Sequence, residues 1–122
     1  MGKFSDLAKG LYNLFNPIAP SFIENSVPSG TAYPYITYSL NSEDWFNEGL
    51  LQVRIWTKST SLLQVSDLTD DLEDIIGEGI RVPLPNKGTI YIYKGSPFAQ
   101  FISDEDITIK TVFINLNYKL FQ

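Results

Sequence analysis

The stretch from Ser61 to Ile76 constrains the fold more than any other part of this 122-residue chain. Its apolar side chains recur every three or four positions and form one stripe: Leu62, Val65, Leu68, Leu72, Ile75 and Ile76. Because the acidic residues lie off this stripe, the pattern predicts an amphipathic helix with one buried face. Ser59 or Ser61 would cap its start, and Gly77 would end it in the left-handed conformation. We expect this helix to be the main cover of a sheet.

Five further segments have the composition and alternation of strands. They are residues 35–40, 50–57, 80–84, 89–93 and 107–120. In the second segment, Leu51, Val53 and Ile55 alternate with polar residues, which places them on the core face. Arg54 and Trp56 then share the opposite face. In the last segment the apolar positions change face partway, which predicts a bulge or a strand buried on both faces.

The N-terminal third combines a helix with a long irregular segment. Residues 4–15 are predicted to be helical, with Ser5 as the N-cap. The apolar stripe of this helix comprises Leu7, Leu11, Leu14 and Phe15. Residues 17–34 contain four prolines and are predicted to form a long loop, and residues 41–49 and 95–106 are predicted to be loops as well.

This order of elements predicts one α+β domain that spans residues 1–122. The sheet should be mainly antiparallel or mixed, with about four to five strands, and two helices should flank it. A chain of 13.8 kDa is long enough to bury one core but not two.

The composition excludes several classes of function. The chain has no His and no Cys, so disulfides, cysteine-ligated zinc sites, Cys nucleophiles and His-based triads are impossible. The net charge is −5 and the nine basic residues are scattered, which argues against direct nucleic-acid binding. No apolar run approaches the roughly 18 residues of a membrane span, and the N-terminus lacks a signal-peptide core. We therefore expect no membrane partner and synthesis in the cytoplasm.

The carboxylates are better explained as solvated surface than as a site. The acidic residues of the 61–76 segment project outward from a helix, whereas a metal site needs ligands that converge. Glu43, Asp44 and the run 104–106 lie in predicted loops. We predict no catalytic residues, no metal and no cofactor. A ligand-binding or enzymatic α+β domain is the alternative, and it requires Glu43 or Asp44 to face residues 104–106 across a closed cleft.

Aromatic side chains gather between residues 33 and 56. They are Tyr33, Tyr35, Tyr38, Trp45, Phe46 and Trp56. Such a group is typical either of half-buried sheet packing or of an interface, where large rings contribute most. Trp45 and Phe46 lie in an otherwise polar segment and are the hardest to assign to a core.

Three segments in order resemble a known family. They are the proline-rich strand entry VPSGTAYPYITYSL, the strand LLQVRIWTKS, and the helix SLLQVSDLTDDLEDII that follows directly. The final strand, in DITIKTVFINLNYKL, comes after an acidic residue. Together, over about residues 28–120, they resemble the tail-completion (tail-terminator) proteins of long-tailed bacteriophages and related prophages. The N-terminal region and the short tip between the helix and the next hairpin depart from the family pattern.

The resemblance implies an α/β fold and a role in virion assembly without catalysis or cofactor. Such proteins form rings, typically hexamers, that end the tail tube and offer a surface to head-tail connector proteins. The expected partners are further copies of the chain, the tail tube protein and the connectors. The expected location is the tail or neck of the virion. A head-completion adaptor or a tube subunit is the alternative within the same class.

The residues themselves suggest where copies would meet. We hypothesise that loops 41–49 and 95–106 project from the ends of the sheet and contact neighbouring copies. Their aromatic residues motivate this: Trp45, Phe46, Phe98 and Phe101. A ring contact joins two different patches on each subunit, and exposed apolar loops are suitable material for one.

Overall fold

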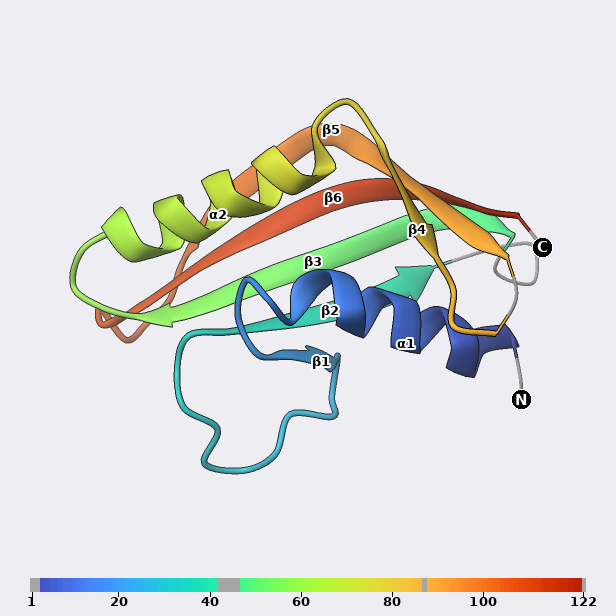
Figure 1. Cartoon of the computed structure of the whole chain (residues 1–122). Coiled ribbons are helices and arrows are strands. Elements are labelled where there is room, and N and C mark those ends of the chain that lie inside the picture. Colours follow the sequence, from blue (N-terminus) through green and yellow to red (C-terminus); the bar gives the residue numbers. More distant parts are fainter. Residues whose placement is uncertain (1–2, 42–46, 87, 122) are drawn as a thin grey trace.

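The computed structural model describes residues 3–41, 47–86 and 88–121. Two helices and six strands follow one another as α1 (Lys3–Phe15), β1 (Ser21–Ile23), β2 (Tyr35–Asn41), β3 (Glu48–Lys58), α2 (Leu63–Ile76), β4 (Ile80–Pro83), β5 (Thr89–Ser103) and β6 (Ile109–Phe121). The strands form one sheet in the order β1-β2-β3-β6-β5-β4, as Figure 1 shows. β1 is parallel to β2 and every other pairing is antiparallel. The α+β class is confirmed, with six strands where four to five were expected.

Both helices lie on the same face of the sheet (Figure 1). Helix α1 packs against β1 and β4, and α2 packs against β3, β5 and β6. The strand register places Leu51, Val53 and Ile55 opposite apolar residues of β6, all fully buried under the helices. The predicted core face of β3 is therefore confirmed, and a single apolar cluster joins both helices to the sheet.

The N-terminal helix is confirmed, but its predicted cap is wrong. Leu7, Leu11 and Phe15 are fully buried, as their spacing requires. The helix starts at Lys3, so Ser5 lies inside its first turn and not at its boundary. The loop predicted for residues 17–34 is interrupted by β1, which pairs with β2. Three residues are too few for an alternating pattern to be visible in the sequence.

Helix α2 is confirmed, but its buried stripe is narrower than predicted. The buried residues of the helix are Val65, Thr69, Leu72 and Ile76, whereas Leu62 and Ile75 are exposed. The hydroxyl of Ser61 accepts a hydrogen bond from the amide of Leu63 at 3.1 Å, although the N-cap position itself has no side-chain cap. Gly77 ends the helix with φ 53° and ψ −132°, which is a positive φ but not the predicted left-handed helical conformation.

The two long C-terminal strands differ most from expectation. Residues 95–103, predicted to be a loop, continue β5 past a register shift between Lys94 and Ala99. The prediction for the last strand, a bulge or burial on both faces, is wrong. β6 pairs with β3 without interruption, and from Val112 onward its buried residues alternate with more exposed ones. Ile107 caused the error: it precedes β6 and is 73% exposed, so it belongs to neither face of the strand.

Candidate interaction surfaces

The sheet face opposite the helices is covered by neither helix. We call it the open face. By register it carries Arg54 and Trp56 of β3 together with Phe113 of β6, because side chains alternate along each strand. The prediction that Arg54 and Trp56 share the face opposite the core is confirmed.

Aromatic rings from three strands pack against one another on the open face. Tyr35 stacks on Trp56 with ring centroids 5.8 Å apart and an interplanar angle of 15°. The Tyr35 ring also contacts the rings of Phe22 and Tyr33, with centroid distances of 6.3 and 5.2 Å. The indole nitrogen of Trp56 donates a hydrogen bond to the Thr37 hydroxyl at 3.1 Å, which restrains the orientation of the ring. Aromatic side chains of this kind are enriched in protein–protein interfaces.

Arg54 lies at the centre of the open face. Its guanidinium lies 3.9 Å from the ring centroid of Trp56 and 4.6 Å from that of Phe113. One terminal nitrogen donates to the Thr111 hydroxyl at 3.2 Å. Burial lowers the pKa of Arg54, while the more distant negative charge of Asp104 acts in the opposite direction. The side chain is therefore a partly desolvated cation held between two rings, a geometry in which cation–π attraction is strengthened.

The four residues first proposed for the interface have different positions. Trp45 and Phe46 lie outside the described residues. Phe98 is partly buried against the core, with the Lys94 ammonium 5.1 Å from its ring. Phe101 is 51% exposed on β5. Phe98 and Phe101 thus belong to a strand and not to a projecting loop.

Phe101 lies at an unpaired sheet edge. Strand β4 pairs with β5 only over Thr89–Ile92, so in the described chain the outer edge of β5 has no partner strand beyond that point. An edge of this kind presents a row of backbone donors and acceptors to another chain. Sequence reasoning missed the edge because it ended the strand at residue 93.

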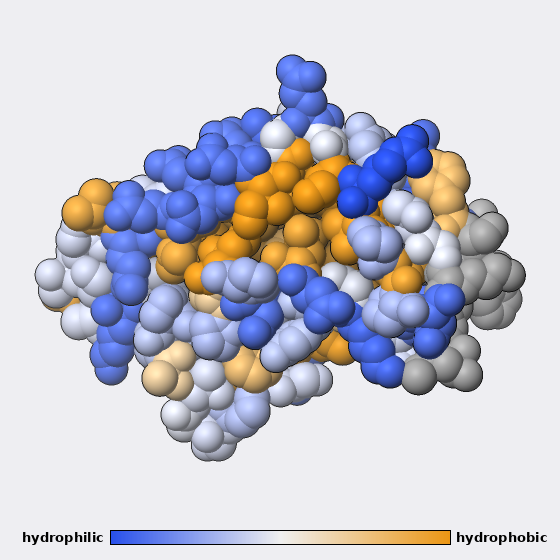
Figure 2. Space-filling model, in the orientation of Figure 1, coloured by the Kyte–Doolittle hydropathy of each residue, from blue (hydrophilic) through white to orange (hydrophobic). Residues whose placement is uncertain are grey.

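The helix-covered side is also hollowed. Figure 2 shows apolar atoms between the polar outer sides of α1 and α2. Partly buried residues of both helices and of β4 pack against the core, among them Leu14, Leu68 and Ile80.

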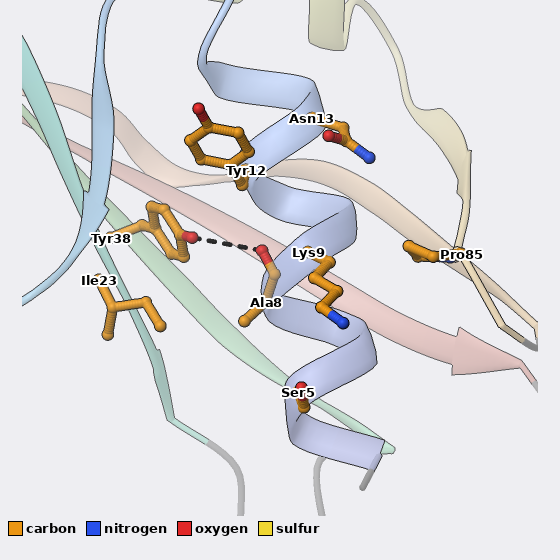
Figure 3. Close-up of a pocket in the computed structure, with 8 residues that line it drawn as sticks. All are labelled: Ser5, Ala8, Lys9, Tyr12, Asn13, Ile23, Tyr38 and Pro85. Carbon is orange, nitrogen blue, oxygen red and sulfur yellow. Dashed lines mark hydrogen bonds between the residues drawn. The ribbon is translucent and has the colours of Figure 1, made fainter. Parts of the chain in front are cut away.

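A shallow concavity of about 570 Å³ lies along α1 (Figure 3). Its lining comprises Ser5, Ala8, Lys9, Tyr12, Asn13, Ile23, Tyr38 and Pro85. The Tyr38 hydroxyl donates to the Ala8 carbonyl at 3.3 Å and ties the helix to β2. The lining contains one cation and no carboxylate, so it does not form the acid–base cleft that an enzymatic alternative requires.

The acidic residues before β6 organise a turn. Asp106 accepts hydrogen bonds from the amide and the hydroxyl of Thr108, at 2.8 and 2.6 Å. These bonds lower the pKa of Asp106. Asp104 accepts from the Asp106 amide at 2.9 Å. Glu43 and Asp44 lie outside the described residues. Within residues 3–41, 47–86 and 88–121, no group of three or more acidic side chains is arranged to hold a metal ion.

Comparison with known proteins adds the fold relationship. No protein-family model matches the sequence, and no curated protein matches it significantly. A chain from the virion of a native gene transfer agent particle superimposes with a TM-score of 0.66, covering 97% of this chain and 93% of that one at 10% identity. This chain has the fold of a virion protein. At such an identity the likeness concerns the fold alone.

Two other solved structures match over most of the chain. One has a TM-score of 0.60 at 13% identity and covers 96% of this chain and 92% of its own. The gp17 protein of bacteriophage SPP1 has a TM-score of 0.48 at 13% identity, covering 95% of this chain and 84% of that one. Neither helix of the described part is long and apolar enough to cross a bilayer.

Proposed function

We propose that this protein is a tail-completion protein that assembles into a ring, a hexamer when complete, at the end of a phage tail tube. The ring ends growth of the tube and offers a docking surface to head-tail connector proteins. Its partners are other copies of the chain, the tail tube protein and the connectors. It acts without catalysis or cofactor, in the tail or neck of the virion, after synthesis in the host cytoplasm.

The fold carries this proposal. A virion protein shares the arrangement over 97% of the chain. The segments that resemble the tail-completion family occupy β2, β3, α2 and β6. Three of these elements are adjacent in the sheet, and α2 packs on two of them. The resemblance therefore covers one contiguous structural unit and not separate surface segments.

The surfaces of the subunit are suitable for a ring. A ring contact is heterologous, so each subunit must present two different patches. The unpaired edge of β5 and the open face are two surfaces available for contacts with other molecules, and they involve different groups. Phe101 at the edge supplies apolar area, whereas the open face supplies stacked rings and a cation.

Electron microscopy and light scattering test the assembly. We expect the chain to form short rings, alone or on purified tail tubes, and to stop extension of tubes by their subunit. Phe101→Ser should weaken ring formation without changing thermal unfolding, because the side chain is exposed in the subunit. Tyr12→Ser is a matched control, since Tyr12 is also exposed but lies on α1. Undiminished assembly of Phe101→Ser would exclude the β5 edge as a contact.

A second candidate is another neck or tail component, either a head-completion adaptor or a tube subunit. The likeness to a virion chain supports this class equally. The same micrographs separate the candidates. Long tubes formed by the chain alone indicate a tube subunit, and binding to head connectors without any effect on tube length indicates an adaptor.

A further inference from the structure

The open face holds a cation, Arg54, that forms no ion pair among the described residues and feels the negative charges of Asp104 and Glu24 only from farther away. The Nε atom of Arg54 is buried without a hydrogen-bond acceptor among the described residues, and Arg54 forms no ion pair with a described carboxylate. Removing a charge from water is costly unless it is paired and hydrogen-bonded. A carboxylate from another molecule would supply the close negative charge that Arg54 does not find among the described residues.

A second basic position lies toward one end of the open face. Arg81 of β4, Tyr91 of β5 and Lys119 of β6 form one cross-strand row. Glu48 continues the row on β3. The Arg81 guanidinium lies 5.9 Å from the Tyr91 ring centroid, and both Arg81 and Lys119 are exposed. The open face thus combines aromatic surface with basic groups at its centre and toward one end, where Glu48 lies opposite Lys119.

The outer side of α2 has the opposite charge. Helix α2 contains five acidic residues and no basic one: Asp67, Asp70, Asp71, Glu73 and Asp74. Glu73 is paired with Lys94 at 2.8 Å. The four aspartates form no ion pair with a described side chain, and Asp70 and Asp74 lie one turn apart on the exposed side. These aspartates thus carry negative charge without a described ion-pair partner, as Arg54 carries positive charge without one.

We propose that the open face of one copy binds the aspartate-bearing side of α2 of a second copy. The inference rests on the proposed function, because it specifies which surfaces join neighbouring copies. Since the two surfaces lie on opposite sides of one sheet, the contact is head-to-tail and continues from copy to copy instead of ending at a dimer. A helix laid on the open face also completes a three-layer packing of the sheet.

The dimensions of the two surfaces agree. Along β6, six residues separate Phe113, the neighbour of Arg54, from Lys119, which corresponds to about 20 Å. Helix α2 has 14 residues and is about 21 Å long. The helix of one copy can therefore lie along the face from Arg54 to Lys119 of the next, and its aspartates cover about 10 Å of that length. Leu63 and Ile75, exposed near the two ends of α2, would then supply apolar contacts to the rings.

Charge reversal in separate chains tests the pairing. The helix variant is Asp70→Lys with Asp74→Lys, and the face variant is Arg81→Glu with Lys119→Glu. All four positions are exposed, so each variant should fold, which circular dichroism and thermal unfolding check. Glu105→Lys, in the exposed turn before β6, is the control for a change in net charge.

We expect each reversed variant to self-associate at least about ten-fold more weakly than the wild type, because like charges then face each other. An equimolar mixture of the two variants should assemble again in alternating order, since every contact then joins opposite charges. Sedimentation velocity measures both effects, and added salt should weaken wild-type assembly. Arg54→Met, which keeps the size of the side chain, should weaken assembly as well.

Three outcomes overturn the inference. The first is wild-type assembly of both reversed variants, and the second is failure of the folded mixture to assemble. The third is loss of binding to tail tubes with self-association unchanged, which would assign the open face to the tube protein. The proposed function fails separately, if the wild-type chain neither associates with itself nor binds and terminates tubes.

Discussion

The packing of helix α2 on the core can be tested by comparing two Leu→Ala variants of the same helix. Leu72 is fully buried in the core cluster, whereas Leu63 in the first turn of the same helix is 67% exposed. Replacing a buried leucine by alanine removes transfer free energy and leaves a cavity, which together cost about 2 to 5 kcal/mol. The same change at an exposed position costs about 0.5 kcal/mol or less. Because both variants are Leu→Ala in one helix, the difference in helix propensity largely cancels.

Urea unfolding followed by circular dichroism measures the effect. With a loss of about 3 kcal/mol and a slope of about 1 to 3 kcal/mol per molar urea, the midpoint of Leu72→Ala should fall by about 1 to 3 M. The midpoint of Leu63→Ala should stay near that of the wild type. Equal losses in the two variants, or a loss below about 1 kcal/mol for Leu72→Ala, would refute the packing of α2 through the middle of its length.

Two further changes test local features. Gly95→Ala should lower the free energy of unfolding by about 1 to 3 kcal/mol, because the new Cβ would lie 2.8 Å from the backbone oxygen of Asn115, and chemical denaturation measures this loss. Thr108→Val should raise the pKa of Asp106 toward its ordinary 3.8, because it removes the hydroxyl whose hydrogen bond is the largest cause of the lowered pKa. The pKa is measured from the carboxyl chemical shift of Asp106, followed by NMR as the pH is varied. Since the pKa of Asp106 is lowered in the folded state, its contribution to stability is present above the unfolded value and is lost as the pH falls through the folded one. Thr108→Val should therefore reduce the loss of stability in acid, and an unchanged pKa would contradict the hydrogen-bond assignment.

The sequence determined which side chains face the core wherever an element is long and regular. The alternation of Leu51, Val53 and Ile55 fixed the inner face of β3, and it placed Arg54 and Trp56 outside. These patterns are local, because a strand has a period of two and a helix has a period of 3.6 whatever lies next to it. The same reasoning gave both helices and the α+β class.

Tertiary structure decided where strands end and what they pair with. Strand β1 exists because its backbone meets β2, and β5 continues through a bulge because β6 provides hydrogen bonds on both sides of it. Neither fact has a local signal, since backbone pairing depends on residues far away in the chain.

For the open face around Arg54, too, the sequence determined one part and the tertiary structure another. The sequence placed Arg54 beside Trp56, but Phe22, Tyr35 and Phe113 join them only through strand order and register. The lack of an acceptor for the buried Arg54 nitrogen is likewise a property of the folded surface. Residue type and spacing thus determined the side on which this arginine lies. Long-range backbone pairing decided that it meets two aromatic rings and forms no ion pair with a carboxylate of the described residues.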